Sequence, residues 1–491
     1  MRKSLLPVVS LFSLSLLSAC GSGSSGRSTN PPPASTTHFS ITAPATATVG
    51  TGVSFAVAAL DSSNALVSTY SGTVQFTSTD AQAVLPANST LTNGTANFSA
   101  TLNTAGSQTI SATDTVTASI TGTSAAITVN APIGFQPTGN METPRAEHTA
   151  TLLTTGEVLV AGGIDNTAAV LGTAELYDSS AASFTPTGSM VSARAGHTAV
   201  SLNSGKVLVA GGVDTNGNFL ASAELFDPAT GTFVATGSMN AARTGHTATL
   251  LQDGTVLVTG GQSTSAAALA TAELFDPASG TFSLTGSMTS VRAQHAAALL
   301  QDGTVLVAGG HDASTNALAT AELFNPANGA FTPTGSLNTA RFEHTATTLS
   351  NGMVLVAGGI DGNGDTFASA ELFDPGVGTF TLTGSLNTAR FLHTATLLND
   401  GTVIFAGGAA LTLTSCGINC ETLVPVSIAS AEIFTPAPAT FAPTAGMQTP
   451  RATHTATLLN GGSVLVTGGT SVQLQGRQII STVLATAELF H

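Results

Sequence analysis

The sequence predicts an all-β protein in which a ring of seven similar four-stranded sheets follows a smaller β-sandwich. Three observations support this prediction. A repeat with a period of 49 residues occupies the chain from residue 145 onward, and apolar and polar residues alternate with a period of two in the segment before it. Only 8% of the residues are charged, against roughly 25% in ordinary soluble domains, and Thr, Ser, Ala and Gly take their place. Such a composition suits short strands and tight turns rather than long helices.

Residues 1–20 are expected to be an export signal. A basic start at residues 2–3 precedes an apolar core, residues 5–17, that is too short to span a bilayer. The core ends in LSACG, residues 17–21, which resembles the lipobox of bacterial lipoproteins. This resemblance implies that Cys20 is lipidated and becomes the mature N-terminus; an ordinary signal peptide with a chance cysteine is the alternative. We therefore expect an exported protein anchored by lipid to the cell envelope, at the outer membrane or the cell surface.

Two segments separate the signal from the repeats. Residues 21–37 are rich in Gly, Ser and Pro and are expected to form a flexible tether. Residues 38–131 contain about seven short alternating segments, such as Val53–Val57, which favour an antiparallel sandwich. The segment resembles the bacterial Ig-like domains that act as spacers in surface proteins, although it lacks the Cys pair and the Trp of an antibody-type core.

The repeat has the form R-x-x-H-[TA]-A, then G-x-V-x-x-x-GG, then AE-[LI]-[FY], then F-x-x-T. Units begin 49 residues apart, except that the last begins 61 residues after the sixth. The basic markers are Arg145, Arg194, Arg243, Arg292, Arg341, Arg390 and Arg451, followed by His148, His197, His246, His295, His344, His393 and His454. The acidic markers are Glu175, Glu224, Glu273, Glu322, Glu371, Glu432 and Glu488.

This unit resembles the kelch repeat, with Phe at the second aromatic position where kelch repeats often have Trp. The resemblance implies four short strands in each unit and a seven-bladed β-propeller over residues 133–491. The last unit stops at His491 after its third strand. Because Phe135 aligns with Phe184, we expect residues 133–140 to supply the missing fourth strand and to close the ring.

Residues that recur in every unit are expected to serve the fold. Seven Arg and seven Glu allow neutral pairs, which is important because an unpaired buried charge is costly. We expect each Arg to pair with a Glu within or between blades, each His to hydrogen-bond the backbone where one blade passes to the next, and the double glycines to permit positive φ or close strand approach. A ring of metal-binding histidines is the alternative, but a catalytic site needs one special constellation rather than seven equal ones.

Function is expected in the loops that follow each double glycine, because these loops vary while the scaffold does not. The sixth is twelve residues longer than the others and the seventh is seven residues longer. The candidate ligand-binding residues of this face are Asp214, His311, Asp361, Asn363, Asp365 and Asn419. Two of these loops are rich in Asp, Asn and Gly, which could hold Ca²⁺ or form simple turns; no other cofactor is expected.

The sixth loop also contains Cys416 and Cys420, with three residues between them. An exported chain meets an oxidising environment, so a disulfide is expected, with a two-thiol metal site as the weaker alternative.

The sequence favours a binding module over an enzyme. A formal net charge of −15 disfavours nucleic acid as a partner. Kelch-like enzymes of the galactose-oxidase type use two tyrosines, a cysteine crosslink and two histidines, whereas this chain has only Tyr70 and Tyr177. We expect a monomeric propeller on a cell-surface lipoprotein that binds a protein or a glycan. A carbohydrate-active enzyme without the radical-copper site is the alternative, and the sequence assigns no catalytic residue and no metal ligand.

Overall fold

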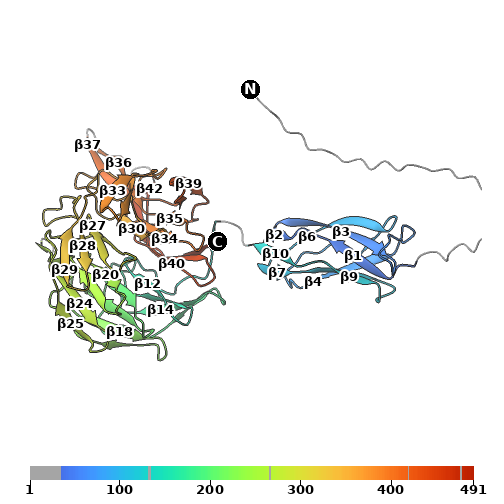
Figure 1. Cartoon of the computed structure of the whole chain (residues 1–491), viewed down its shortest axis with the longest axis horizontal. Helices are drawn as coiled ribbons and strands as arrows, with labels where there is room; N and C mark the ends of the chain where they lie inside the picture. The colour runs from blue at the N-terminus through green and yellow to red at the C-terminus, as the bar shows by residue number, and fades with distance from the viewer. Residues whose placement is uncertain (1–34, 131–133, 265–266, 418–419, 476–477) are drawn as a thin grey trace, which may run out of the picture. The chain divides into compact units, whose positions relative to one another are not determined.

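The computed structural model describes residues 35–130, 134–264, 267–417, 420–475 and 478–491. These residues form strands, turns and loops, and none of them forms a helix that could cross a membrane. The chain divides into two compact units, Met1–Pro132 and Ile133–His491 (Figure 1).

The first unit is built from three small β-sheets around one apolar core. One sheet has the order β1 (His38–Thr42), β3 (Gly52–Leu60), β6 (Thr95–Thr101). A second has the order β5 (Ser89–Thr90), β4 (Thr73–Ser78), β8 (Ile110–Asp114), β9 (Thr121–Thr123), and the third has β2 (Thr46–Thr48), β10 (Ile127–Asn130), β7 (Gly106–Gln108). Along β3 every second side chain is buried, namely Val53, Phe55, Val57 and Ala59. The period-two pattern of the sequence therefore marks the face that packs into the core.

The second unit contains seven four-stranded antiparallel sheets, which we call blades one to seven. Blades one to three are β12 (Thr149–Leu152), β13 (Val158–Ala161), β14 (Ala174–Asp178), β15 (Ser183–Pro186); β16 (Thr198–Ser201), β17 (Val207–Ala210), β18 (Ala223–Asp227), β19 (Thr232–Ala235); and β20 (Thr247–Leu250), β21 (Val256–Thr259), β24 (Ala272–Asp276), β25 (Thr281–Leu284). Blades four and five are β26 (Ala296–Leu299), β27 (Val305–Ala308), β28 (Ala321–Asn325), β29 (Ala330–Pro333); and β30 (Thr345–Thr348), β31 (Val354–Ala357), β32 (Ala370–Asp374), β33 (Thr379–Leu382). Blades six and seven are β34 (Thr394–Leu397), β35 (Val403–Ala406), β38 (Ala431–Thr435), β39 (Thr440–Thr444); and β40 (Thr455–Leu458), β41 (Val464–Thr467), β44 (Ala487–Phe490), β11 (Phe135–Pro137).

The blades form a closed ring, because the first strand of each blade contacts the first strand of the next and β40 contacts β12. The second strand of every blade is buried along its whole length, since neighbouring blades cover both of its faces. The double glycines lie where adjacent blades meet. Gly162 has φ +66°, and a Cβ added there would lie 2.5 Å from the carbonyl oxygen of Arg194 in the next blade. The expected need for glycine at this close approach is confirmed.

Blade seven combines both ends of the unit. Strand β11 pairs with β44, with Phe135 opposite Phe490 and their rings 5.1 Å apart. Beyond this pair, Gly134 and His491 exchange two backbone hydrogen bonds of 3.3 Å. The ring is therefore closed by residues that lie more than three hundred positions apart in the sequence.

The two longest loops form β-hairpins. Blade six carries β36 (Ala409–Gly417) and β37 (Cys420–Ser427), and blade seven carries β42 (Thr470–Gln475) and β43 (Gln478–Val483). A third, short hairpin in blade three pairs β22 (Gln262–Thr264) with β23 (Ala267–Ala268). The Ser427 hydroxyl joins the two long hairpins, since it donates to the carbonyl of Thr470 and accepts from the amide of Val472, both at 2.9 Å.

Candidate functional site

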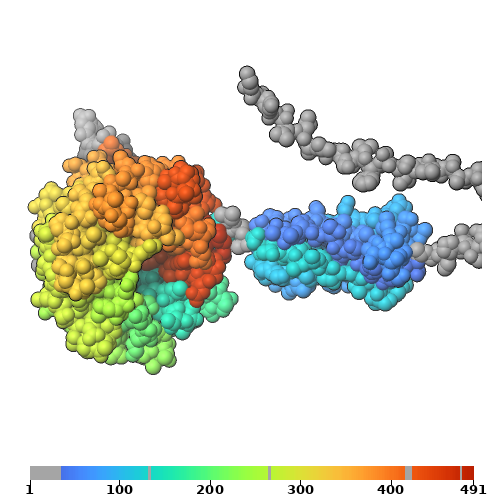
Figure 2. Space-filling view, in the orientation of Figure 1, coloured from blue at the N-terminus to red at the C-terminus, as the bar shows by residue number. Residues whose placement is uncertain are grey.

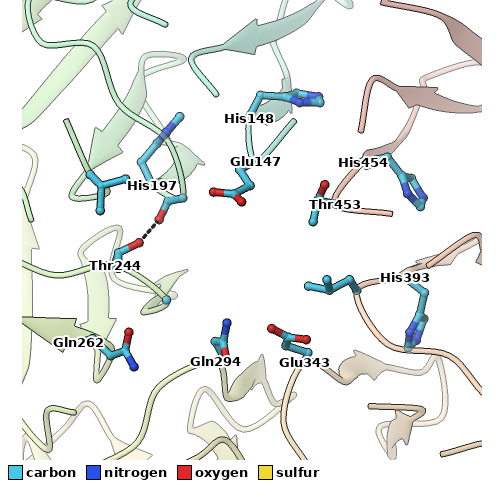
Figure 3. Close-up of a pocket in the computed structure, with 14 residues that line it drawn as sticks. Glu147, His148, His197, Thr244, Gln262, Gln294, Glu343, His393, Thr453 and His454 are labelled. Atoms are coloured by element: carbon cyan, nitrogen blue, oxygen red, sulfur yellow. Dashed lines mark hydrogen bonds between the residues drawn. The ribbon is translucent and has the colours of Figure 1, made fainter. Parts of the chain in front are cut away.

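All seven blades contribute to one cavity of about 560 Å³ at the centre of the ring (Figures 2 and 3). Each blade supplies the residue that immediately precedes its repeat histidine. These rim residues are Glu147, Gly196, Gly245, Gln294, Glu343, Leu392 and Thr453. Val213 and Gln262, the first residues of two of the variable loops, line the cavity as well, so it opens beside the face that carries these loops.

The rim residues share an unusual backbone conformation. All seven have a positive φ, between +51° and +61°, although only two of them are glycines. Left-handed backbone is disfavoured for residues with a Cβ, and such strain concentrates at functional sites. Here the rest of the ring imposes the same backbone on every blade.

A circle of hydrogen bonds explains this conformation. The amide of each rim residue donates to the carbonyl of the rim residue in the preceding blade, at 2.9–3.4 Å, in six of the seven steps. At the remaining step the hydroxyl of Thr244 donates to the carbonyl of Gly196 at 2.9 Å. Because the backbone is held in this way, the side chains of the non-glycine rim residues are presented to the cavity in fixed positions.

The expected pairing of each repeat Arg with a repeat Glu is confirmed in all seven blades. The distance between the guanidinium nitrogen and the carboxylate oxygen is 2.6–3.1 Å. In blade one Arg145 also donates to the carbonyls of Gly162 and Thr173 at 2.9 and 3.0 Å. Glu175 accepts the amides of residues 142 and 143, in the segment that enters the blade. Each pair is fully buried and lies within one blade, where it fixes the chain just before the rim.

The repeat histidines contact a threonine side chain of the preceding blade. The Nε2 atom of His197 lies 3.0 Å from the hydroxyl of Thr149, the first residue of the preceding blade's first strand, and five other blades share this contact. At the same junction the carbonyl of Arg194 accepts the amide of Gly163 at 2.9 Å, and a backbone hydrogen bond between His197 and Arg194, of the kind expected from the sequence, opposes the lowering of the histidine pKa. His344 has no Nε2 partner, because Ala296 occupies the threonine position.

Two carboxylates give the cavity its electrostatic character. In Figure 3 Glu147 and Glu343 extend into the same open space from different sides, while the imidazole rings of His148, His393 and His454 point away from its centre. Burial raises the pKa of Glu147. Burial also raises the pKa of Glu343, to about 7. The negative charge of Glu147 raises this pKa further, whereas a hydrogen bond from Gln294 lowers it.

The histidines near this cavity are uncharged at neutral pH. Burial and the adjacent arginines lower the pKa of His148 and His454 to about 3, and they lower that of His197 and His393 well below its usual value. In the part of the chain that the structure describes, no Lys or Arg lines the cavity.

The aspartates predicted as ligands serve their own turns. In the loops that begin with Asp214 and Asp361, one carboxylate oxygen of the aspartate accepts hydrogen bonds from the backbone amides two and four residues further on. The distances are 2.8 and 2.9 Å for Asp214 and 2.9 Å for both hydrogen bonds of Asp361. The amide donors are Asn216, Asn218, Asn363 and Asp365. These side chains lie on exposed loops outside the central cavity, and calcium binding there stays a prediction.

The other predicted site residues also lie outside the cavity. His311 is buried, with its Nδ1 atom 2.8 Å from the carbonyl of Asp312 and its ring against Phe342. The backbones of Cys416 and Cys420 lie near the tip of the β36–β37 hairpin, where Gly417 pairs with Cys420. Their side chains, Asn419 and Cys20 fall outside the described residues, so the disulfide and the lipidation stay predictions.

The rim residues were not predicted from the sequence, because only the invariant Arg and His of the Arg-x-x-His motif were considered. The available signal was the position before each histidine, which varies between charged, amide, apolar and glycine residues inside an otherwise constant motif. Variation at a fixed point of a rigid scaffold is the pattern expected of a recognition surface.

Residues 147–359 match the family model described as the KLHDC2/KLHL20/DRC7 Kelch-repeats domain. Among solved structures, the chain is similar to a novel fungal alcohol oxidase of the AA5 family in complex with copper, with 17% identity, a TM-score of 0.57, and coverage of 73% of this chain and 76% of that one. The structure of YjhT is matched with 15% identity, a TM-score of 0.46, and coverage of 58% of this chain and 99% of that one. No curated protein matches the chain. At 17% identity the likeness to the alcohol oxidase shows the fold alone.

Proposed function

Starting from a chain that carries a kelch-repeat β-propeller, we propose that it is a cell-surface lipoprotein that binds a protein or a glycan through the variable-loop face. The observation that carries the proposal is the convergence on this face of the seven variable rim residues and the two long hairpins. Both features depart from the repeat, whereas the recurring Arg, His and Glu residues are occupied by the scaffold.

The β36–β37 hairpin presents apolar side chains to solvent. Leu413 and Leu423 lie opposite each other on its two strands and are 62% and 46% exposed. On the neighbouring β42–β43 hairpin Ile479 is 49% exposed. Exposed apolar side chains gathered on a projecting element suit a contact with another protein.

The N-terminal segments fit an anchored binding protein. A lipid on Cys20, a tether over residues 21–37 and an Ig-like spacer over residues 38–131 would hold the propeller away from the membrane. In this proposal the first unit acts as a spacer, and the ligand is bound by the second.

The test is a protein and glycan array probed with the chain from residue 21 onward. We expect a ligand whose binding falls about tenfold or more in the Leu413→Asp/Leu423→Asp variant, because charged side chains would replace the apolar contact. The matched control is Leu382→Asp, at a leucine of β33 that is 65% exposed and lies outside the hairpins. Equal binding by all three proteins would exclude the hairpin as a contact surface.

One observation favours the alternative of a carbohydrate-active enzyme. Glu343, with its pKa raised to about 7, lies in a cavity with a second carboxylate, and a general acid needs such a pKa. The residues of the radical-copper site do not fit this cavity, because Tyr177 is buried inside blade one and Tyr70 belongs to the first unit. Turnover of a polysaccharide that is abolished by Glu343→Gln would establish the enzyme reading.

A further inference from the structure

The two cavity carboxylates have no cationic partner among the described residues. Each repeat Arg is paired with its repeat Glu, and Lys206 is paired with Asp227. Glu147 and Glu343 take part in none of these ion pairs; Glu147 is exposed to the open cavity and Glu343 is half-buried. Each carboxylate raises the energy of the other's charged form, and a bound cation would relieve that repulsion.

The remaining groups around the cavity are neutral. Gln294, Gln262, Thr244 and Thr453 supply amides and hydroxyls, and Leu392 and Val213 supply apolar side chains. Above pH 7 the two glutamates are therefore the only charged side chains among the described residues that line the cavity. The ligand that matches this lining carries a positive charge and hydrogen-bonding groups.

The arrangement suits an organic cation better than a metal ion. Bound Ca²⁺ or Zn²⁺ takes several protein ligands, and no group of three or more His, Cys, Asp or Glu side chains in the described part of the chain is placed to hold one. The volume of about 560 Å³ is within the range of small-molecule sites. An ammonium group needs fewer anionic partners, and its hydrogen bonds to carboxylates are strong because both groups are charged.

We propose that the central cavity binds the primary ammonium group of a small organic cation between Glu147 and Glu343. This inference rests on the proposed binding function, because it names the chemistry of a ligand on the same face. The amides and hydroxyls of the rim would bind the polar remainder of the ligand. Such an ammonium group occurs on an amino sugar and on an alkyl diamine, and the experiment separates these two sources.

Binding of the cation should depend on pH in a defined direction. The groups that face Glu343 are Glu147 and neutral side chains, since burial lowers the pKa of every lining histidine well below its usual value, to about 3 for His148 and His454. As the pH falls through about 7, Glu343 takes up a proton and loses the charge that attracts the ligand. Affinity should therefore rise from pH 6 to pH 8, with release of protons on binding at pH 7.

The experiment is calorimetric titration of the chain from residue 21 onward with 6-amino-6-deoxyglucose and with 1,4-diaminobutane. Glucose and 1,4-butanediol, which lack the charge, are the matched neutral probes. We expect at least one amine to bind about tenfold or more tightly than its neutral counterpart at pH 8. The stronger amine identifies the source as a sugar or an alkyl chain.

The variant Glu147→Gln/Glu343→Gln should weaken amine binding about tenfold or more without lowering the melting temperature, since it keeps the side-chain shape and removes two charges that repel each other. Glu157→Gln, in the turn between β12 and β13, is the control and should bind like the parent chain. Failure of both amines to bind at pH 8, equal binding of the neutral probes, or unchanged binding by the double variant would overturn the proposal. None of these results would affect array binding that depends on Leu413 and Leu423, so the two proposals fail separately.

Discussion

At the residue scale, the same position can serve either the fold or recognition, and the local contacts show which. His197 and its equivalents are buried and neutral, and all of them except His344 are bonded to a threonine of the preceding blade. One residue earlier, the rim position contributes its backbone to the hydrogen-bond circle and leaves its side chain free to vary. Two adjacent residues of one motif thus have opposite roles, because one side chain enters the blade interface and the other faces the cavity.

The missing threonine in blade four offers a direct test of the histidine contact. We expect Ala296→Thr to stabilise the propeller by about 1 kcal/mol, because it supplies the hydrogen bond that His344 Nε2 lacks. The reverse change in another blade, Thr198→Ala, should destabilise it by a similar amount, since it removes the 2.9 Å contact with His246. Denaturant unfolding of both variants measures the effect. A loss of stability in Ala296→Thr would contradict this account.

At the element scale, β11 and β44 hold the ring closed. Strand β44 lies between β41 and β11, so it is the only link between the first strand of the unit and the rest of blade seven. A second contact between the ends lies on the loop side, where the Asn166 side chain accepts the amide of Val483 at 2.6 Å and donates to its carbonyl at 3.2 Å. Blades one and seven are thus held together by the pairing of β11 with β44 and by the Asn166 side chain, which makes two hydrogen bonds to the backbone of Val483.

Deletion of residues 482–491 should abolish cooperative unfolding of the second unit. The deletion removes β44, so β11 loses its partner and β41 keeps only β40, which exposes the core between blades six and seven. Calorimetry should then show the transition of the first unit alone, whereas deletion of residues 1–37 should leave both transitions in place. A second unit that melts at an unchanged temperature after loss of residues 482–491 would refute closure by β44.

At the scale of the whole molecule, the seven buried histidines couple stability to pH. Their pKa values are lowered by burial and by the adjacent arginines, to about 3 for His148, His246, His344 and His454. The unfolded chain protonates its histidines near pH 6.5, whereas the folded chain does not. Stability is therefore complete above about pH 6.5 and falls as the pH is lowered toward 3, because protons bind preferentially to the unfolded state.

We expect the unfolding free energy of the second unit to decrease from pH 7.5 to pH 5, with a slope that approaches the uptake of seven protons per molecule. Each proton corresponds to about 1.4 kcal/mol per pH unit. Urea titrations at several pH values measure the slope. His246→Gln should reduce it by about one proton, while stability that does not change between pH 7.5 and 5 would show that the histidines are not neutral in the folded state.

The sequence by itself determined the repeated scaffold. The period of 49 residues, the alternating strands and the paired counts of Arg and Glu predicted the all-β propeller and its internal ion pairs. These features are local or repeat in every unit, so their physical reasons can be read within one blade. The alignment of Phe135 with Phe184 even indicated the strand that closes the ring.

Only the tertiary structure decided where the candidate site lies. Glu147 and Glu343 are separated by almost two hundred residues, and ring closure alone brings them to one cavity. Their pKa shifts arise from this shared enclosure, and their inward direction arises from a left-handed backbone fixed by hydrogen bonds between blades. A repeat pattern specifies the contacts that every blade makes. The charge and polarity of the cavity depend instead on the rim residue, which differs from blade to blade.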